Sequence, residues 1–388
     1  MDIQIVRNAF KAKFNTEGAV YASPGRINLI GEHTDYNGGF VFPGAVDKGM
    51  VAEIKPNGLD KVRAYAIDIN PADGEANYVE FGLNEEDKPQ EHWACYVFGV
   101  CREMQKRGVE VKGFDTAFAG DVPLGAGMSS SAALESTFAF ALNEIYGEGK
   151  IDKFELAKVG QMTEHHYCGC NCGIMDQFAS VFGKEGCLMR LDCRSMEFEY
   201  FPFDPKGYKL VLVNTCVKHM LGDEYNQRRK SCEDVVAALK PKYPNIETLR
   251  DVDYDMLAEA KPLVSEIDYG RAHYVLGEKD RVLAVCDALE KGDYETVGQK
   301  MYETHWGMSK EYQVSCDELD FLAVLAKECG VTGCRVMGGG FGGCTINLVK
   351  DELYDDFVAK AKSEFEKKFG HAPLVYDVVI GNGSRRIA

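Results

Sequence analysis

Apolar residues recur at helical spacing in several segments of the chain. One such set consists of Leu134, Phe138, Ala141, Leu142 and Ile145. Gly147 follows this set at a position where helices commonly end, so we predict a helix over residues 130–146. The segments DELDFLAVLAKECG and YDDFVAKAKSEFEKKFG have the same spacing and end at Gly330 and Gly370. Each of them predicts a further helix.

A short apolar run predicts a buried strand in the second half of the chain. KLVLVN, residues 209–214, is nearly continuous in apolar and β-branched residues, which is typical of a strand covered on both faces. A glycine-rich loop, GGGFGGC at residues 338–344, leads into another predicted strand. Because helical and strand patterns are interspersed in both halves, we predict an α+β protein of two domains, 1–200 and 201–388.

Length, composition and charge narrow the class of protein. The chain has 388 residues and 45% hydrophobic content, enough for two domains with a large core. Its formal net charge of -17 argues against a general binder of nucleic acid or anionic membranes, since these need a basic surface. MDIQIVRNAFKAKF lacks the pattern of a signal peptide, and no apolar run approaches about 18 residues. We expect a cytoplasmic protein without a membrane span.

The 14 cysteines are scattered and form no CxxC pair, so we expect reduced thiols. The closest group is Cys168, Cys170 and Cys172 in YCGCNCG, which could in principle hold a soft metal. We expect the three side chains to point to different sides of the chain, and therefore no zinc site there.

Small residues precede the helix predicted at residues 130–146, in the segment DVPLGAGMSSSAALE. A helix N-terminus offers unpaired N–H groups and the positive end of the helix dipole, and glycines let a phosphate approach closely. The residues of this cradle are Gly125, Gly127, Ser129, Ser130 and Ser131. The loop is neither a P-loop nor a dinucleotide fingerprint, because it lacks the P-loop lysine and the third glycine. Taken alone, it could also be a plain helix cap.

Four blocks of sequence resemble the GHMP kinases, and among them the galactokinases. The small-residue loop resembles the PxxxGLxSSA phosphate loop, and GRINLIGEHTDYNGG (25–39) is similar to the galactokinase signature nearly residue for residue. CGIMDQFAS (172–180) and GGGFGGC agree as well, in the same order. One departure precedes the last block, where CRVM stands in place of the usual SRMT. The resemblance implies two α+β lobes with the active site in the cleft between them.

The resemblance implies that residues 25–39 recognise the hydroxyl groups of a sugar. The implied sugar-binding residues are Glu32, His33, Asp35, Gly173 and Tyr225. Carboxylates suit this task because each accepts two hydroxyl hydrogen bonds. From the residues alone, the acidic and histidine side chains could form a solvated loop, which that view favours, or a metal site.

Two residues are implied as catalytic. Asp176 would take the proton from the anomeric hydroxyl or orient it, and Arg26 would stabilise charge on the transferred phosphoryl group. The alternative is a salt bridge between them without a chemical role.

ATP and Mg²⁺ are the cofactors that the resemblance implies. Ser131 and Glu164 match the positions that hold magnesium in other GHMP kinases, although Glu164 could instead be a surface carboxylate. Trp93 and Tyr96 match a WxxY of the adenine pocket, although such a pair is also typical of core packing. Gly340 belongs to the third motif and is expected at the nucleotide.

Two pairs of neighbouring residues are expected to have no part in the site. The histidines at 165 and 166 diverge by about 100 degrees on a helix, so we expect structural roles. Arg228 and Arg229 are expected on a solvated helix face.

The implied reaction is ATP-dependent phosphorylation of α-D-galactose at the C1 hydroxyl, giving galactose 1-phosphate and ADP. We expect the protein to be a monomer. A related sugar 1-kinase acting on N-acetylgalactosamine or L-arabinose would share nearly every motif. A galactose and ATP sensor without turnover is disfavoured, because such proteins lose part of the serine loop and SSSAA is intact here.

Overall fold

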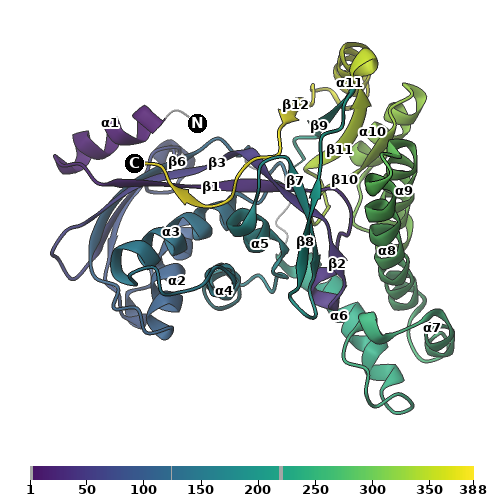
Figure 1. Ribbon diagram of the computed structural model, residues 1–388, viewed down its shortest axis with the longest axis horizontal. Coiled ribbons are helices and arrows are strands. Elements are labelled where there is room, and N and C mark those ends of the chain that lie inside the picture. Colours follow the sequence, from purple (N-terminus) through teal and green to yellow (C-terminus); the bar gives the residue numbers. More distant parts are fainter. Residues whose placement is uncertain (1–2, 124, 218–221) are drawn as a thin grey trace.

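A computed structural model describes residues 3–123, 125–217 and 222–388 (Figure 1). A six-stranded sheet is built mainly from the first third of the chain, in the order β13-β1-β3-β6-β4-β5. Its strands are β1 (Ala19–Asn28), β3 (Pro43–Pro56), β4 (Val62–Ala66), β5 (Tyr78–Phe81), β6 (Phe114–Gly120) and β13 (Arg385–Arg386). Neighbouring strands are antiparallel except β4 and β6, which are parallel.

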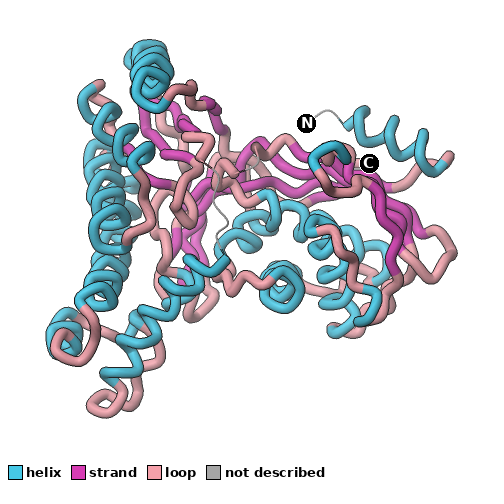
Figure 2. The backbone as a smooth tube through the Cα atoms, turned by 180° about the vertical axis from the view of Figure 1, so that it is seen from behind, coloured by secondary structure: helices cyan, strands magenta, loops and turns pink. Residues whose placement is uncertain are grey.

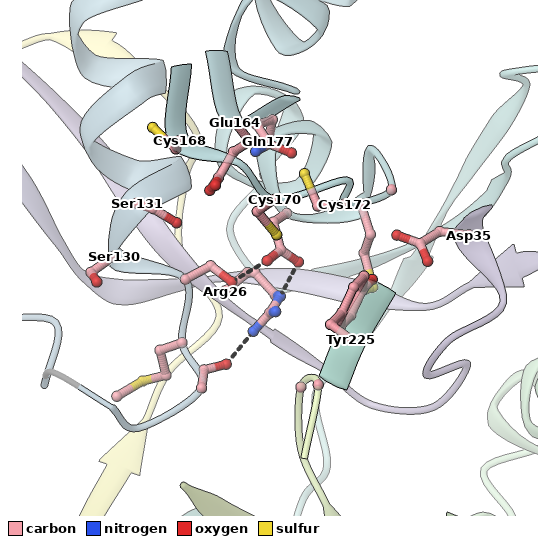
Figure 3. A pocket seen from close by; sticks show the side chains of 18 of the residues that line it. Arg26, Asp35, Ser130, Ser131, Glu164, Cys168, Cys170, Cys172, Gln177 and Tyr225 are labelled. Atoms are coloured by element: carbon pink, nitrogen blue, oxygen red, sulfur yellow. Dashed lines mark hydrogen bonds and ion pairs between the residues drawn. The ribbon is translucent and has the colours of Figure 1, made fainter. Parts of the chain in front are cut away.

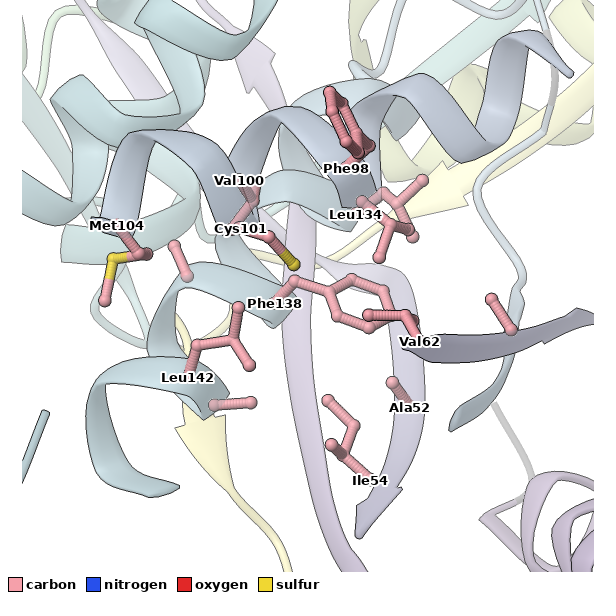
Figure 4. Packing of buried hydrophobic residues seen from close by; sticks show 14 of the residues in the cluster. Ala52, Ile54, Val62, Phe98, Val100, Cys101, Met104, Leu134, Phe138 and Leu142 are labelled. Carbon is pink, nitrogen blue, oxygen red and sulfur yellow. The ribbon is translucent and has the colours of Figure 1, made fainter. Parts of the chain in front are cut away.

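Helices cover both faces of this sheet. The helices of this part are α1 (Ile3–Phe14), α2 (His92–Lys106), α3 (Ser130–Tyr146), α4 (Lys153–Thr163) and α5 (Met175–Phe182). Side chains of β3 and β4 pack with Phe98 of α2 and with Leu134 and Phe138 of α3 (Figure 4). Val6 of α1 packs with Val20 and Val51 in a separate cluster on the other side.

A second, four-stranded antiparallel sheet has the order β10-β11-β9-β12. Its strands are β9 (Tyr208–Asn214), β10 (Gly333–Val336), β11 (Cys344–Lys350) and β12 (Leu374–Val378). The helices around it are α6 (Gly222–Leu239), α7 (Tyr254–Ala260), α8 (Glu266–Glu290), α9 (Tyr294–Gly307), α10 (Asp317–Glu328) and α11 (Tyr354–Phe369). Val211 packs with α10 and α11, whereas Leu212 packs with α8. Strand β9 is thus covered on both faces, as predicted.

The two sheets share one apolar core. Ile27 and Leu29, at the end of β1, cluster with Leu212 and Ile346 of the second sheet and with Val282 of α8. A small third sheet of β2 (Phe40–Val41), β7 (Cys187–Asp192) and β8 (Phe198–Pro202) lies beside this junction (Figures 1 and 2). The lobes are therefore packed together at the base of the cleft.

The predicted fold class and elements are confirmed. The α+β class holds, and α3 coincides with the helix predicted at residues 130–146. Helix α10 is followed by Gly330, and α11 ends at Gly370, whose φ of 81° is the left-handed cap that glycine allows. No helix in the described ranges combines the length and apolar character needed to cross a membrane.

The domain division near residue 200 stays a proposal. The second sheet begins at Tyr208, which agrees with it. Strand β13 departs from it, because Arg385 and Arg386 return to pair with β1 of the first sheet.

Candidate active site

A cavity of about 670 Å³ opens between the lobes. It is lined by β1, the segment after β1, the loop before α3, the segment between α4 and α5, α6, and the loop between β10 and β11. The predicted site residues that line it are Arg26, Glu32, His33, Asp35, Tyr96, Gly125, Gly127, Ser129, Ser130, Ser131, Glu164, Gly173, Asp176 and Tyr225. Residues as far apart in the chain as Arg26 and Gly339 therefore meet on one surface.

Arg26 is held rigidly at the centre of this surface. Its Nε donates to Asp176 Oδ1 at 2.7 Å, and its Nη1 donates to the carbonyl of Gly127. Its backbone N–H donates to Met128 O at 3.0 Å, next to a register shift between β1 and β3. Burial lowers the pKa of Arg26, but Asp176 and Glu32 raise it by more, so the guanidinium stays charged.

Asp176 lies in the first turn of α5 and accepts hydrogen bonds on both carboxylate oxygens. Arg26 bonds Oδ1, and the hydroxyl of Ser129 bonds Oδ2. Ser129 has a φ of 57°, a left-handed conformation that directs its side chain away from the helix it precedes. The predicted Arg26–Asp176 salt bridge is present, at the cavity wall.

The phosphate-loop residues surround the start of α3. Gly125 and Gly127 have φ values of 72° and 68°, which glycine adopts without strain. Ser131, in the first turn of α3, hydrogen-bonds Glu164. Burial and the nearby Asp176 raise the pKa of Glu164 to about 7, although the bond from Ser131 opposes this. Glu164 is buried at the cavity, so the surface alternative is wrong.

Asp35 and Gly173 are in close contact on the opposite side of Arg26. A Cβ added at Gly173 would lie 1.8 Å from Asp35 Oδ2, so a larger residue there would have to displace the Asp35 carboxylate. Burial, and to a lesser degree the charge of Asp176, raises the pKa of Asp35 to about 6. Figure 3 shows Ser130 and Ser131 on one side of Arg26, and Asp35 and Tyr225 on the other.

Glu32 is fixed by the second lobe. Its Oε1 accepts from Arg335 Nη2 at 3.0 Å and from the backbone N–H of Gly338 at 2.8 Å. Arg335 is fully buried and also donates to the carbonyls of Asn28 and Leu29. Arg335 belongs to the segment CRVM, which was noted above only because it differs from the usual SRMT; no role was predicted for its arginine. Only the fold, which brings β10 against the end of β1, identifies this partner.

His33 has both ring nitrogens bonded. Its Nε2 lies 3.1 Å from the carbonyl of Gly339, which can only accept, so Nε2 donates. Nδ1 then accepts from the Tyr36 hydroxyl at 2.8 Å, and Tyr36 accepts from Tyr312 at 2.6 Å. Burial lowers the pKa of His33 to about 3, so the ring is neutral. The ring of Tyr225 lies 5.4 Å from it, centroid to centroid.

Two predicted nucleotide residues do not line the cavity. Trp93 packs against Phe118, and its indole N–H donates to Ala76 O at 2.8 Å, so it has the core role given as its alternative. Gly340 packs against Val314, whose carbonyl would lie 2.2 Å from an added Cβ. Its neighbours Gly338 and Gly339 line the cavity instead. Helical spacing alone could not show which side of α2 faces the cavity.

Two other predictions are corrected. Arg228 is buried, not solvated, because it donates to Gln313 O and lies over the ring of Phe341, whereas Arg229 is partly exposed. Cys168, Cys170 and Cys172 all line the cavity, so the expectation that they point to different sides is wrong. Residues spaced by two share one face of an extended segment, and here the chain is helical up to Cys168 and turns at Gly169. Among the described residues, no group of three or more metal-ligating side chains is arranged to hold a metal ion.

The neighbouring histidines bond different partners. His166 Nδ1 lies 2.9 Å from Glu103 Oε1, and His165 Nε2 lies 2.8 Å from the carbonyl of Cys172. The second of these contacts steadies the segment that leads to Gly173.

Comparison with known protein families gives three matches. Residues 8–56 match the galactokinase galactose-binding signature, residues 95–184 match the GHMP kinase N-terminal domain, and residues 286–367 match the GHMP kinase C-terminal domain. Every residue from the opening signature discussed above lies in the first match.

Full-length relatives are similar to the chain along its whole course. Galactokinase of Clostridium beijerinckii is 38% identical over 100% of this chain and 99% of its own length. Galactokinase of Bacillus subtilis is 39% identical over 95% of this chain and 94% of its own.

Solved structures agree with this similarity. The Lactococcus lactis galactokinase complexed with galactose has a TM-score of 0.92 and 31% identity, covering 98% of each chain. A mevalonate kinase, at 18% identity and a TM-score of 0.64, shares the fold alone. Because the identity extends over whole chains and all three family patterns fall in order, this chain belongs to the galactokinase family of the GHMP kinases.

Proposed function

We propose that this protein transfers the γ-phosphoryl group of MgATP to the C1 hydroxyl of α-D-galactose, giving α-D-galactose 1-phosphate and ADP. The observation that carries the proposal is the Arg26–Asp176 ion pair at 2.7 Å, which stands between the serine loop and the predicted sugar residues. Full-length relatives named galactokinases, and the galactose in one related structure, support galactose as the sugar.

The sugar subsite is formed by Glu32, Asp35, Gly173 and Tyr225, with His33 beside them. Asp35 accepts hydroxyl hydrogen bonds, and Glu32 has its Oε2 available because Arg335 and Gly338 use only Oε1. The neutral ring of His33 is already bonded on both nitrogens, so it fixes the wall of the subsite. A sugar that misplaces a hydroxyl leaves these buried groups unpaired, which is a strong basis for discrimination.

Asp176 receives or orients the C1 hydroxyl of the sugar. Both of its oxygens already accept one hydrogen bond, and each keeps a second lone-pair direction for the substrate. Arg26 keeps its charge beside this carboxylate and stabilises the negative charge that develops on the transferred phosphoryl oxygens.

The nucleotide subsite follows from the loop before α3. The backbone around Gly125 and Gly127 and the hydroxyls of Ser130 and Ser131 donate to phosphate oxygens. The hydroxyl of Ser131 and the carboxylate of Glu164 fit Mg²⁺, which prefers oxygen ligands and usually takes one or two carboxylates beside substrate phosphates. When bound there, the metal would neutralise phosphate charge. Tyr96 is the aromatic residue of α2 placed at the cavity for the base.

The experiment that tests the proposal is ADP release with MgATP across D-galactose, N-acetylgalactosamine, L-arabinose and D-glucose. Phosphorus NMR then locates the new phosphate. Release with galactose and an anomeric phosphate is the expected result. Release with a different sugar only would contradict galactose while keeping a sugar 1-kinase. Galactose binding without ADP release from any sugar would contradict catalysis and favour a sensor.

A further inference from the structure

A buried polar pair, Glu135 and Gln177, lies at the wall of the cavity, and Gln177 is one of the residues that line it. Gln177 Nε2 donates to Glu135 Oε2 at 3.0 Å, and the two residues are 1% and 0% exposed. Among the described residues, Glu135 Oε1 and Gln177 Oε1 have no hydrogen-bond partner. Burial of polar atoms without partners is unfavourable, so an apolar pair would serve better if holding helices together were the only task.

The pair lies where three helices meet, each near one of the proposed site residues. On α3, Glu135 follows Ser131 by one turn, and on α5, Gln177 directly follows Asp176. The third helix, α4, contributes Gly160, one turn before Glu164. Each of these three positions therefore lies directly beside, or one helical turn from, a residue of the proposed chemistry.

Because Gly160 has no side chain, there is space beside α4 for the side chains of Glu135 and Gln177. A Cβ there would lie 2.7 Å from Gln177 Cγ and 3.0 Å from Glu135 Oε2. Helices α3, α4 and α5 therefore meet at this hydrogen-bonded pair. Gln177 and Glu164 both line the cavity (Figure 3).

A hydrogen bond constrains direction, which an apolar contact does not. If α3 rotated or slid against α5, the 3.0 Å bond would be lost, and Ser131 and Asp176 would move apart with it. Small displacements of reacting groups have large effects, since about 1 Å of misplacement can cost about 100-fold in rate.

We propose that Glu135 and Gln177 are positioning residues, which fix Ser131, Glu164 and Asp176 relative to one another by tying α3 to α5 over Gly160. This inference rests on the proposed function for its kinetic consequence. Neither residue touches the substrates in this role, so the effect of losing the bond falls on the rate of phosphoryl transfer and not on sugar binding.

The test compares Gln177→Leu, which keeps the size and removes the donor, with the wild type. Glu135→Leu removes the acceptor, whereas Glu135→Gln keeps an amide oxygen that can accept. The matched control is Leu142→Ala, also fully buried on α3 but in the core cluster away from the cavity. Measurements are kcat, KM for galactose and ATP, the galactose Kd by calorimetry, Tm, and hydrogen–deuterium exchange of residues 129–135 and 175–178 without ligands.

The expected result is a kcat lower by about 10- to 100-fold for Gln177→Leu and Glu135→Leu, with the galactose Kd within about twofold of the wild type. Glu135→Gln should keep most of the rate. Leu142→Ala should lower Tm comparably but leave kcat unchanged, and only the Leu variants at 135 and 177 should accelerate exchange in both segments. If Gln177→Leu does not fold, Gln177→Asn, which shortens the side chain, carries the same expectations.

Two results would overturn the inference. One is a kcat for Gln177→Leu equal to that of Leu142→Ala, which would make the pair merely structural. The other is a Glu135→Gln variant as slow as Glu135→Leu, which would give the carboxyl group itself the role. Failure of the proposed function would appear separately as wild-type inactivity with galactose, and the exchange measurement would still decide the positioning claim because it needs no turnover.

Discussion

Gly173 and Asp35 are packed so closely that a Cβ on the glycine would lie 1.8 Å from Asp35 Oδ2. We expect Gly173→Ala to displace the carboxylate and raise KM for galactose by about tenfold or more, with the ATP Kd unchanged. Gly270→Ala on α8 is the control, since its added Cβ has only an ordinary 3.7 Å contact with Glu311 O. Equal sugar affinities in the two variants would remove Asp35 from the sugar subsite.

Galactose affinity should fall in acid because of Asp35. Burial and the charge of Asp176 raise the pKa of this carboxyl to about 6, so below that pH it is protonated and loses charge-assisted acceptance. We expect Kd to rise by about three- to tenfold between pH 7.5 and pH 5, measured by calorimetry. Asp35→Asn should bind weakly with a flat pH profile, and an unchanged wild-type slope in that variant would assign the titration to another group.

The same pKa shift predicts a gain in stability for Asp35→Asn. A carboxyl whose folded pKa is raised contributes stability below its ordinary pKa, and that contribution is lost as the pH rises through about 6. The variant should therefore gain in Tm over the wild type by a few degrees at pH 8, and gain least at pH 4. A larger gain in acid than at pH 8 would contradict the raised pKa.

Asp176→Asn should lose most turnover while galactose still binds. The amide cannot receive the C1 proton and pairs poorly with Arg26 Nε, so we expect kcat to fall by at least about 100-fold. Asp60→Asn, at an exposed turn, is the matched control. Turnover of Asp176→Asn near that of the control would leave the salt bridge without a chemical role.

Glu164→Gln should raise the Mg²⁺ concentration needed for half-maximal rate by about tenfold or more. The change keeps the hydrogen bond to Ser131 possible but removes the charge. Glu155→Gln, on helix α4 that ends just before Glu164, lies away from the cavity and should leave the Mg²⁺ titration unchanged. Mn²⁺ binding followed by electron paramagnetic resonance in the presence of ATP gives a readout without turnover, and equal Mn²⁺ affinity in both variants would exclude Glu164 as a ligand.

Sequence motifs predicted most of the cavity wall, because chemistry at these positions depends on particular residue types. Arg26 and Asp176 could be paired in advance from their motifs. Periodicity likewise placed α3 and β9, since a core-facing helix or strand has to repeat its apolar residues.

The remaining contacts depend on long-range packing that local patterns do not encode. Arg335 lies in a short buried strand, and its partners are about 300 positions away, so nothing near it indicates an ion pair with Glu32. Arg228 lies in a polar segment of α6, which predicts a solvated side chain. It is buried because Phe341 and Gln313, which are distant in the sequence, pack against it. Trp93 and Tyr96 are three positions apart on α2, but only Tyr96 lines the cavity, which their spacing could not show.

Strand β13 has a consequence for how the chain is made. It supplies the edge next to β1, and Ser384 also bonds Ser23 and the carbonyl of Ser180, in the helix that carries Asp176. During synthesis these residues emerge only after the whole second sheet. The first lobe, although encoded mostly in the first half, can therefore reach its final form only after the second lobe has been translated, and a nascent chain that stops near residue 200 would leave Tyr21 and Ala22 of β1 on an open sheet edge.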